Sequence, residues 1–370
     1  MFAVDPGNTA RFETAVLNEA TVQIPWEELR PGPDGEYLVV IDEDKAGNKR
    51  NPPVDLDHPE LLAQDGLPPS DGNPQFRQQM VYAVAMKTIR NFENALGRRA
   101  HWPPLRDGDH TGSSYRRQLA LYPHFEVVPN AYYVEGTGLC FGYFLGQPDS
   151  PLAGTWVFTC LSQDIITHQI THALLRGMNL EFDAAGDDMA LHEAFADLVA
   201  LFQHFGDSDV LREQISAVRG DLDERNQLGV VALQMGQAVG QPNGIRDALG
   251  RVDAEGRWQP RRPDRLAYQT ITEPHQRGDI LLGAVFDAFK KIYGSRVADL
   301  RRIASRGTGI LPAGRLHPDL ISRLSREASE IAQRVQHVCI RALDYLPPID
   351  VTFGDFLRAL ITGDYDLFPT

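Results

Sequence analysis

The chain has 370 residues, which is enough for two domains or for two lobes that share a cleft. An apolar content of 42% and a charged content of 23% are typical of a globular protein, and the net charge of −14 argues against a nucleic-acid partner. No apolar run reaches the length of a membrane span, and the first residues carry no signal-peptide pattern. The three cysteines lie far apart and form no C-x-x-C pair, so we expect a cytoplasmic protein with no membrane partner and no disulfide framework.

The first 73 residues are rich in proline, glycine and aspartate, and residues 36–41 are their one strand candidate. Prolines in the stretch 51–73, among them Pro52, Pro53, Pro68 and Pro69, predict an extended segment that runs over the surface. We therefore expect residues 1–73 to form an N-terminal extended or β segment.

A long amphipathic helix is expected over residues 74–96, because apolar residues such as Met80 recur there at helical spacing. Asn73 is placed to cap this helix, Pro74 suits its first turn, and Gly97 is placed to end it.

Residues 118–160 carry alternating apolar residues and β-formers, with glycine-rich turns between them. Four strands are predicted in this region, over residues 125–128, 131–134, 140–144 and 155–158. We expect an antiparallel sheet whose edge lies against the helix that follows.

Two histidines, His168 and His172, are four residues apart in a predicted helix and therefore lie on the same face of it. Two imidazoles in this arrangement can bind one zinc ion, as in the H-E-x-x-H helix of metallopeptidases. The residue after the first histidine is Gln169, where the reaction of those enzymes needs glutamate.

The sequence from residue 189 onward has helical periodicity almost to its end. Helices are expected over residues 189–202, 208–218, 226–240, 278–293, 296–304, 317–345 and 353–362. The predicted fold is α+β with two lobes. Residues 74–178 form an N-terminal lobe with the sheet, long helices and the histidine helix, and residues 179–370 form an all-helical C-terminal lobe.

Two carboxylates, Glu193 and Asp197, lie one turn apart on a helix that is apolar nearly all round. Buried carboxylates are costly unless they are paired or bind metal. Glu193 is a natural third zinc ligand, and Asp197 can accept the free N–H of a ligand histidine. The alternative is that both histidines are core residues and that both carboxylates form ordinary buried hydrogen bonds.

Residues 74–370 resemble the thermolysin-like metallopeptidases, which are also called gluzincins. Residues 164–174 are similar to that family's zinc helix, D-x-x-x-H-E-x-x-H-A, and residues 192–197 are similar to its N-E-A-x-S-D segment. The resemblance implies a two-lobed thermolysin-like fold with zinc held by His168, His172 and Glu193.

Further segments resemble the same family in the same order. Asn130 and Ala131 match the edge strand that binds the substrate backbone, and His275 matches the histidine that stabilises the oxyanion. Arg246 matches, more loosely, an arginine that holds a substrate carbonyl. Residues 341–346 and 353–359 resemble the family's C-terminal helices.

Three departures from the family pattern change what the resemblance implies. Gln169 replaces the catalytic glutamate, Asp183 falls near the position of a tyrosine that helps to bind the oxyanion, and His204 replaces a calcium-binding carboxylate. The better comparison is a smaller, cytoplasmic, bacterial-type branch, in which we do not expect the paired calcium site.

The expected function is that of a zinc-dependent endopeptidase scaffold that acts on peptides or proteins and lacks its general base. Gln169 could be an engineered replacement, or it could be natural in a zinc-binding pseudopeptidase that binds peptides or regulates a partner. A third reading assigns weak activity to another base, such as Glu181 or Asp183.

Overall fold

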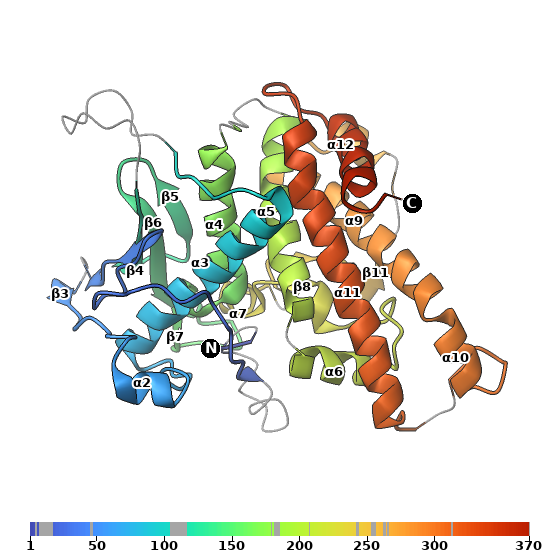
Figure 1. The fold of residues 1–370 in the computed structure, drawn as a ribbon, viewed down its shortest axis with the longest axis horizontal. Coiled ribbons are helices and arrows are strands. Elements are labelled where there is room, and N and C mark those ends of the chain that lie inside the picture. The colour runs from blue at the N-terminus through green and yellow to red at the C-terminus, as the bar shows by residue number, and fades with distance from the viewer. Residues whose placement is uncertain are drawn as a thin grey trace. The chain divides into compact units, whose positions relative to one another are not determined.

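The computed structural model describes residues 1–3, 6, 18–44, 47–103, 117–178, 180, 186–206, 208–241, 244–252, 257–261, 264, 266–311 and 314–369. They form two compact units. The first comprises Met1–Glu181 with Ala232–Ile245, and the second comprises Phe182–Val231 with Arg246–Thr370. The protein therefore combines helices with a sheet, as the sequence predicts (Figure 1). Within the described residues, none of the helices has the length and apolar character needed to cross a membrane.

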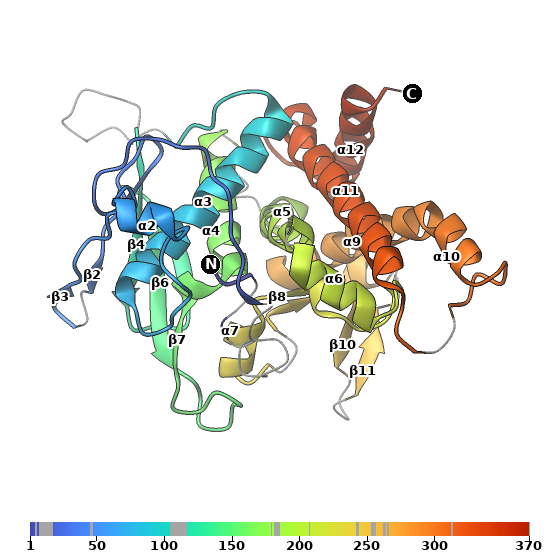
Figure 2. The ribbon, with the colours of Figure 1, turned by 60° about the horizontal axis from the view of Figure 1, so that its bottom comes forward.

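The first unit contains the main sheet and two long helices that pack against it. Its strands are β1 (Leu38–Val40), β2 (Glu43–Asp44), β3 (Lys49–Arg50), β4 (Leu119–Glu126), β5 (Ala131–Val134), β6 (Gly138–Leu145) and β7 (Trp156–Phe158). Its helices are α2 (Pro59–Ala63), α3 (Pro74–Leu96), the 3-10 turn η3 (Thr159–Leu161), α4 (Gln163–Gly177) and α7 (Leu233–Ala238). Helices α3 and α4 pack against each other and against the sheet (Figures 1 and 2).

The main sheet has the strand order β1-β4-β6-β5, and β7 also pairs with β6. The strands predicted over residues 131–134, 140–144 and 155–158 are present as β5, β6 and β7, whereas the strand expected over residues 125–128 lies earlier in the chain, as β4. The expectation of an antiparallel sheet in this region is wrong for β4, which pairs in parallel with β6. Both β1–β4 and β4–β6 are parallel, whereas β5–β6 and β6–β7 are antiparallel. Strand β5 lies at the edge of this sheet, beside α4, as expected.

Helix α3 confirms the prediction for residues 74–96 at both ends. The Asn73 side chain accepts a hydrogen bond from the Gln75 N–H, and Pro74 occupies the first turn. Gly97 ends the helix in the left-handed region with φ 69°, a conformation that glycine adopts at little cost. Met80 is fully buried and belongs to the core, as predicted.

The segment that precedes α3 is tied to the core by a buried polar cluster. The Asp42 carboxylate lies 2.5 Å from His124 Nδ1 of β4 and accepts a hydrogen bond from the Gln78 amide of α3 at 2.7 Å. Burial alone would raise the pKa of Asp42, but hydrogen bonds from His124, Gln78 and Asn51 lower it below its ordinary value. The expected extended stretch also contains one short helix, α2.

The second unit is built mainly from helices around α5. Its helices are α5 (Asp187–Gln203), η4 (His204–Gly206), α6 (Ser208–Ala217), η5 (Gln227–Gly229), α8 (Ala267–Thr270), α9 (Pro274–Arg296), α10 (Ala298–Ala304), α11 (Pro318–Ala342), η6 (Leu343–Tyr345) and α12 (Phe353–Leu367). Helix α5 is buried along most of its length and packs against α9 and α11 (Figure 2).

The expectation of an all-helical C-terminal part is wrong. The second unit contains two short hairpin-like pairs, β8 (Val230–Val231) with β9 (Arg246–Asp247) and β10 (Gly250–Val252) with β11 (Trp258–Pro260). The helix predicted over residues 226–240 is replaced by η5, β8 and α7. Pairing of Val231 with Arg246 takes the chain out of the helical pattern at this point.

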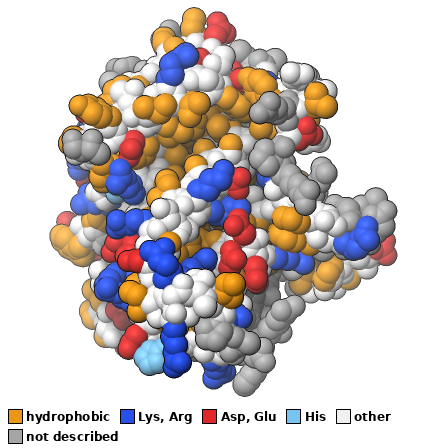
Figure 3. Space-filling view, turned by 90° about the vertical axis from the view of Figure 1, so that its right-hand side faces the viewer, with side chains coloured by type: hydrophobic (Ala, Val, Ile, Leu, Met, Phe, Trp, Pro, Cys, Tyr) orange, Lys and Arg blue, Asp and Glu red, His pale blue; other side chains and the backbone are white. Residues whose placement is uncertain are grey.

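Helix α12 is apolar on two sides, and only one of them is covered. Ala359 and Gly363 are buried, with Gly363 close to the Val338 carbonyl of α11. Leu357, Ile361 and Tyr365 recur at four-residue intervals and are exposed. Figure 3 views the side on which α12 lies and shows hydrophobic side chains gathered on its upper part.

Asp187 joins the first turn of α5 to three other helices of the second unit, α8, α9 and α12. Its carboxylate accepts hydrogen bonds from Arg277 Nε of α9 at 2.7 Å, from the Tyr268 hydroxyl at 2.6 Å and from the Phe353 N–H of α12 at 3.1 Å. Burial alone would raise the pKa of Asp187, but these three donors lower it.

We expect Asp187→Asn to lower the free energy of unfolding at pH 7 by about 3–5 kcal/mol, because it leaves the buried Arg277 guanidinium without its counter-ion. Since the folded-state pKa of Asp187 is depressed, its contribution is present above the ordinary carboxyl range and is lost as pH falls. Urea unfolding of the unmodified protein and of Asp187→Asn should show a difference in unfolding free energy at pH 7 that becomes smaller at pH 3. Asp364→Asn, which removes an exposed partner of Arg334, should change stability little.

Candidate metal centre

The residues predicted for the site come from both units. His168, His172 and Gln169 lie on α4 of the first unit, and Asn130 and Ala131 lie at the start of β5 in the same unit. The remaining four, Glu193, Asp197, Arg246 and His275, belong to the second unit, on α5, β9 and α9.

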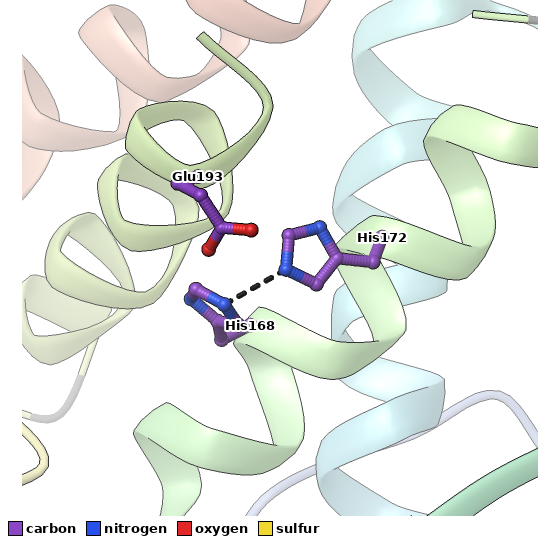
Figure 4. Close-up of side chains that lie close together, drawn as sticks. All are labelled: His168, His172 and Glu193. Atoms are coloured by element: carbon purple, nitrogen blue, oxygen red, sulfur yellow. Dashed lines mark hydrogen bonds between the residues drawn. The ribbon is translucent and has the colours of Figure 1, made fainter. Parts of the chain in front are cut away.

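Helix α4 presents its two histidines together, as their spacing predicts. The Ser162 side chain caps the helix, and the carboxylate of the fully buried Asp164 accepts a hydrogen bond from the Ala232 N–H at 2.8 Å. On the following turns the His168 and His172 rings stand perpendicular to each other with their Nε2 atoms 2.8 Å apart (Figure 4). Both rings therefore aim a ligand atom at the same point.

The histidine pair fits zinc with a small adjustment. Zn–N bonds of about 2.0–2.1 Å in a tetrahedral site place two nitrogens about 3.3 Å apart, so the rings would move apart by roughly half an ångström. The buried imidazole of His172 and the half-buried one of His168 are suitable zinc ligands, because each has to offer only a neutral ring nitrogen. Glu193, which is also labelled in Figure 4, comes from α5 of the second unit.

Gln169 faces the edge strand of the sheet. Its side-chain Nε2 donates a hydrogen bond to the Ala131 carbonyl of β5 at 2.9 Å. This hydrogen bond holds the Gln169 amide in one orientation, with its NH₂ group directed at the backbone of β5. An ionised carboxylate at the same position would have no hydrogen to donate to this carbonyl.

The start of β5 uses its polar groups within the first unit. The Asn130 side chain folds back so that its oxygen accepts from the Ala131 N–H at 2.9 Å, and the Asn130 carbonyl accepts from the Gly142 N–H of β6. Asn130 is exposed and Ala131 is buried. A peptide that paired with this edge would therefore have to compete with the hydrogen bond from Gln169.

Within the second unit, Glu193 of α5 and His275 of α9 lie side by side. Glu193 Oε2 is 3.4 Å from His275 Nε2, and His275 Nδ1 is 2.9 Å from the Glu273 carboxylate. Glu273 also caps α9 by accepting from the Gln276 N–H. Burial alone would raise the pKa of Glu273, but the hydrogen bonds from Gln276 and His275 lower it.

One turn further along the same two helices, Asp197 of α5 and Asp279 of α9 both form ion pairs with Arg246 of β9. Arg246 Nε lies 3.3 Å from Asp197 Oδ2 and 3.4 Å from Asp279 Oδ1. All three side chains are mostly buried. Arg246 is therefore placed between two carboxylates.

Two residues of this region escaped the sequence analysis. Glu273 could have been found from the pattern of a carboxylate followed by Pro274, which is typical of a helix N-terminus. Asp279 could have been found from its spacing of four residues after His275, which predicts the same helix face.

Of the other candidates, His204 is the one that lies within the described residues. His204, at the expected calcium position, is buried in η4 with its Nδ1 3.3 Å from the Leu228 carbonyl. Glu181 and Asp183, considered as substitute bases, lie outside the described residues. The three cysteines are buried and unbridged, as the sequence predicts.

Comparisons with known proteins find a likeness among solved structures. No protein-family model matches the chain, and no curated protein matches it. Among solved structures, it is similar to the precursor of protealysin, a metalloproteinase from Serratia proteamaculans. The two have 13% sequence identity and a TM-score of 0.49, over 99% of this chain and 94% of that chain. The assignment of family and activity therefore rests on the residues of this chain.

Proposed function

We propose that the protein is a zinc-binding protein of the thermolysin-like peptidase type, in which Gln169 replaces the general base. The proposed ligands are His168, His172 and Glu193, and the proposed partner is a peptide or protein substrate. The observation that supports this most directly is the pair of histidine Nε2 atoms that converge from one face of the buried helix α4. The unbridged cysteines support a cytoplasmic location.

Glu193 is the proposed third ligand because it combines a carboxylate with a supporting neighbour. It lies on the next long helix after the histidines, and Asp197 follows it by one turn. In the proposed site, Asp197 accepts the free N–H of a ligand histidine and so fixes its orientation. This arrangement leaves a fourth coordination position for water or substrate.

A zinc ion bound by these three residues would supply a Lewis acid for a water molecule and for the carbonyl of a peptide bond. His275, held by Glu273, is then the proposed donor to the developing oxyanion. Gln169 can donate and accept hydrogen bonds but takes up no proton at neutral pH, so it orients groups without acting as a base. Peptide hydrolysis by the unmodified chain should therefore be weak.

A second candidate function is favoured by the contact between Gln169 and β5. The amide binds the Ala131 carbonyl, which an ionised carboxylate cannot do, so glutamine has a defined partner at a position where it cannot act as the base for cleavage. We therefore retain the alternative of a zinc-binding pseudopeptidase with a peptide-binding or regulatory role. The two candidate functions share the metal site and differ in whether a bound peptide is hydrolysed.

The proposed ligand set predicts about one zinc ion per chain in protein purified without added metal. Glu193→Gln should weaken zinc binding strongly, because the amide offers a neutral oxygen in place of a carboxylate. Elemental analysis of both forms checks this. His192→Ala, the neighbouring residue on α5, is the matched control and should retain zinc. Full zinc content in Glu193→Gln, or loss in His192→Ala, would refute the ligand set.

A further inference from the structure

Helices α5 and α9 of the second unit face each other through two pairs of residues, each spaced by one turn. Glu193 and Asp197 lie on α5, and His275 and Asp279 lie on α9. The first pair is Glu193 with His275, and the second joins Asp197 and Asp279 through Arg246. The two sets of contacts therefore follow each other by one helical turn along the facing sides of α5 and α9.

The close approach of α5 and α9 makes these side-chain contacts possible. A Cβ at Gly278 would lie 3.0 Å from the Ala190 carbonyl and 3.3 Å from the Ala194 N–H. Glycine at this position therefore lets α9 approach the α5 backbone directly. The result is that the side chains at 275 and 279 are brought within reach of those at 193 and 197.

The position of Arg246 between Asp197 and Asp279 is fixed by its backbone as well as by its side chain. Arg246 pairs with Val231 in the β8–β9 ladder. Arg261 fixes the same strand to α9, since its guanidinium donates to the Asp247 carbonyl at 3.1 Å and to the Asp279 carbonyl at 2.7 Å. The distance between Arg246 and Asp279 is thus set by the pairing of Arg246 with Val231 and by the hydrogen bonds that Arg261 donates to the backbone of β9 and α9.

We propose that Asp279 is a positioning residue that holds Arg246 between two carboxylates and thereby keeps the Asp197 carboxylate a strong hydrogen-bond acceptor. The proposal rests on the proposed function, in which Asp197 orients a zinc-binding histidine. If Asp279 lost its charge, Arg246 would pair with Asp197 alone. Asp197 would then support the histidine less well, so zinc binding would weaken.

The Asp279 carboxyl changes its charge within the pH range of the zinc-binding experiment described below. Burial raises the pKa of Asp279 to about 6, although Arg246 and Arg261 act to lower it. The other charged or titratable groups that face it are Asp197 on α5 and His275 on its own helix. The support given to Asp197 should therefore be complete above about pH 7 and should decline as Asp279 takes up a proton.

The test compares zinc dissociation constants of the unmodified protein and of Asp279→Asn by chelator competition between pH 5 and pH 8. At pH 7.5 we expect the variant to bind zinc about 3–10-fold more weakly, which is less than the 10–100-fold typical of direct partners of a ligand. The ratio of the two constants should approach one near pH 5. Asp287→Asn, which removes the same charge from α9 at a residue paired with Lys290, should leave zinc binding unchanged.

A ratio that does not vary with pH would indicate general damage to the fold and would overturn the proposal, as would a ratio of one throughout. An effect of Asp287→Asn equal to that of Asp279→Asn would also overturn it. The pH dependence is informative because protonation of the ligand histidines affects both proteins and cancels in the ratio.

A second measurement needs no zinc. In the zinc-free protein, the Nε–H NMR signal of Arg246, assigned with Arg246→Lys, should shift between pH 5 and pH 7. The shift should persist in His275→Gln and disappear in Asp279→Asn. An Arg246 signal that stays constant would overturn the proposal. Failure of the unmodified protein to bind zinc would instead refute the proposed function, while the NMR titration still decides whether Asp279 holds Arg246.

Discussion

Replacing Gln169 with glutamate should give the protein a chelator-sensitive endopeptidase activity roughly 10²–10⁴-fold above that of the unmodified chain. The replacement is nearly isosteric, and it supplies a carboxylate that can take a proton from water and pass it to the leaving amine. It leaves all three proposed zinc ligands untouched. Cleavage of a peptide library at matched zinc content measures the effect.

The hydrogen bond from Gln169 to Ala131 adds a pH dependence to this result. In Gln169→Glu, an ionised carboxylate would face the Ala131 carbonyl where the amide now donates at 2.9 Å. Two acceptors at this distance repel each other, which favours the protonated acid and raises the pKa of the new carboxyl. Activity should therefore rise with pH as this carboxyl ionises.

Gln169→Asp is the matched control for the new activity. It introduces the same charge on a side chain one methylene shorter, so it should give much less activity because a base must lie within hydrogen-bond reach of its proton. Equal activity in the two variants would point to an electrostatic effect of the charge alone. A Gln169→Glu variant as inert as the unmodified protein would favour the peptide-binding alternative.

Removal of zinc by a chelator should lower the thermal stability of the unmodified protein and leave His172→Ala unaffected. A ligand that binds only the folded state stabilises it by about 2.7 kcal/mol when its free concentration is 100 times the dissociation constant. His172 supplies one of the two converging nitrogens, so alanine at this position should abolish binding and with it the zinc-dependent part of stability.

Thermal unfolding with and without EDTA measures this effect for both proteins. His58→Ala is the control, because this histidine caps α2 far along the chain from the proposed ligands. A chelator-induced shift of equal size in His172→Ala would mean that the stabilising zinc is bound elsewhere.

Features whose signals are local in sequence were predictable. Helix α3 begins and ends where Asn73, Pro74 and Gly97 place its caps, because capping depends on backbone groups a few residues away. The convergence of His168 and His172 follows in the same way from the geometry of one helix.

Features that depend on distant partners were not predictable. The parallel pairing of Leu38 with Leu119 joins segments whose separate patterns carry no information on direction. The broken helix over residues 226–240 results from strand pairing with Arg246, which local periodicity cannot reveal. The same holds for Asp279, whose role depends on a strand and a helix that meet only in the folded unit.

Segment Ala232–Ile245 belongs to the first unit, although the chain has by then completed the start of the second. Its Ala238 packs with Phe144 and Val157, and the Ala238 carbonyl accepts a hydrogen bond from the Gln147 N–H at 2.9 Å. A ribosome releases residues in sequence order, and domains usually fold as they emerge. Here the sheet-bearing unit lacks part of its apolar core until residue 245 has been synthesised, so it cannot be completed before residues 182–231 of the second unit have been made.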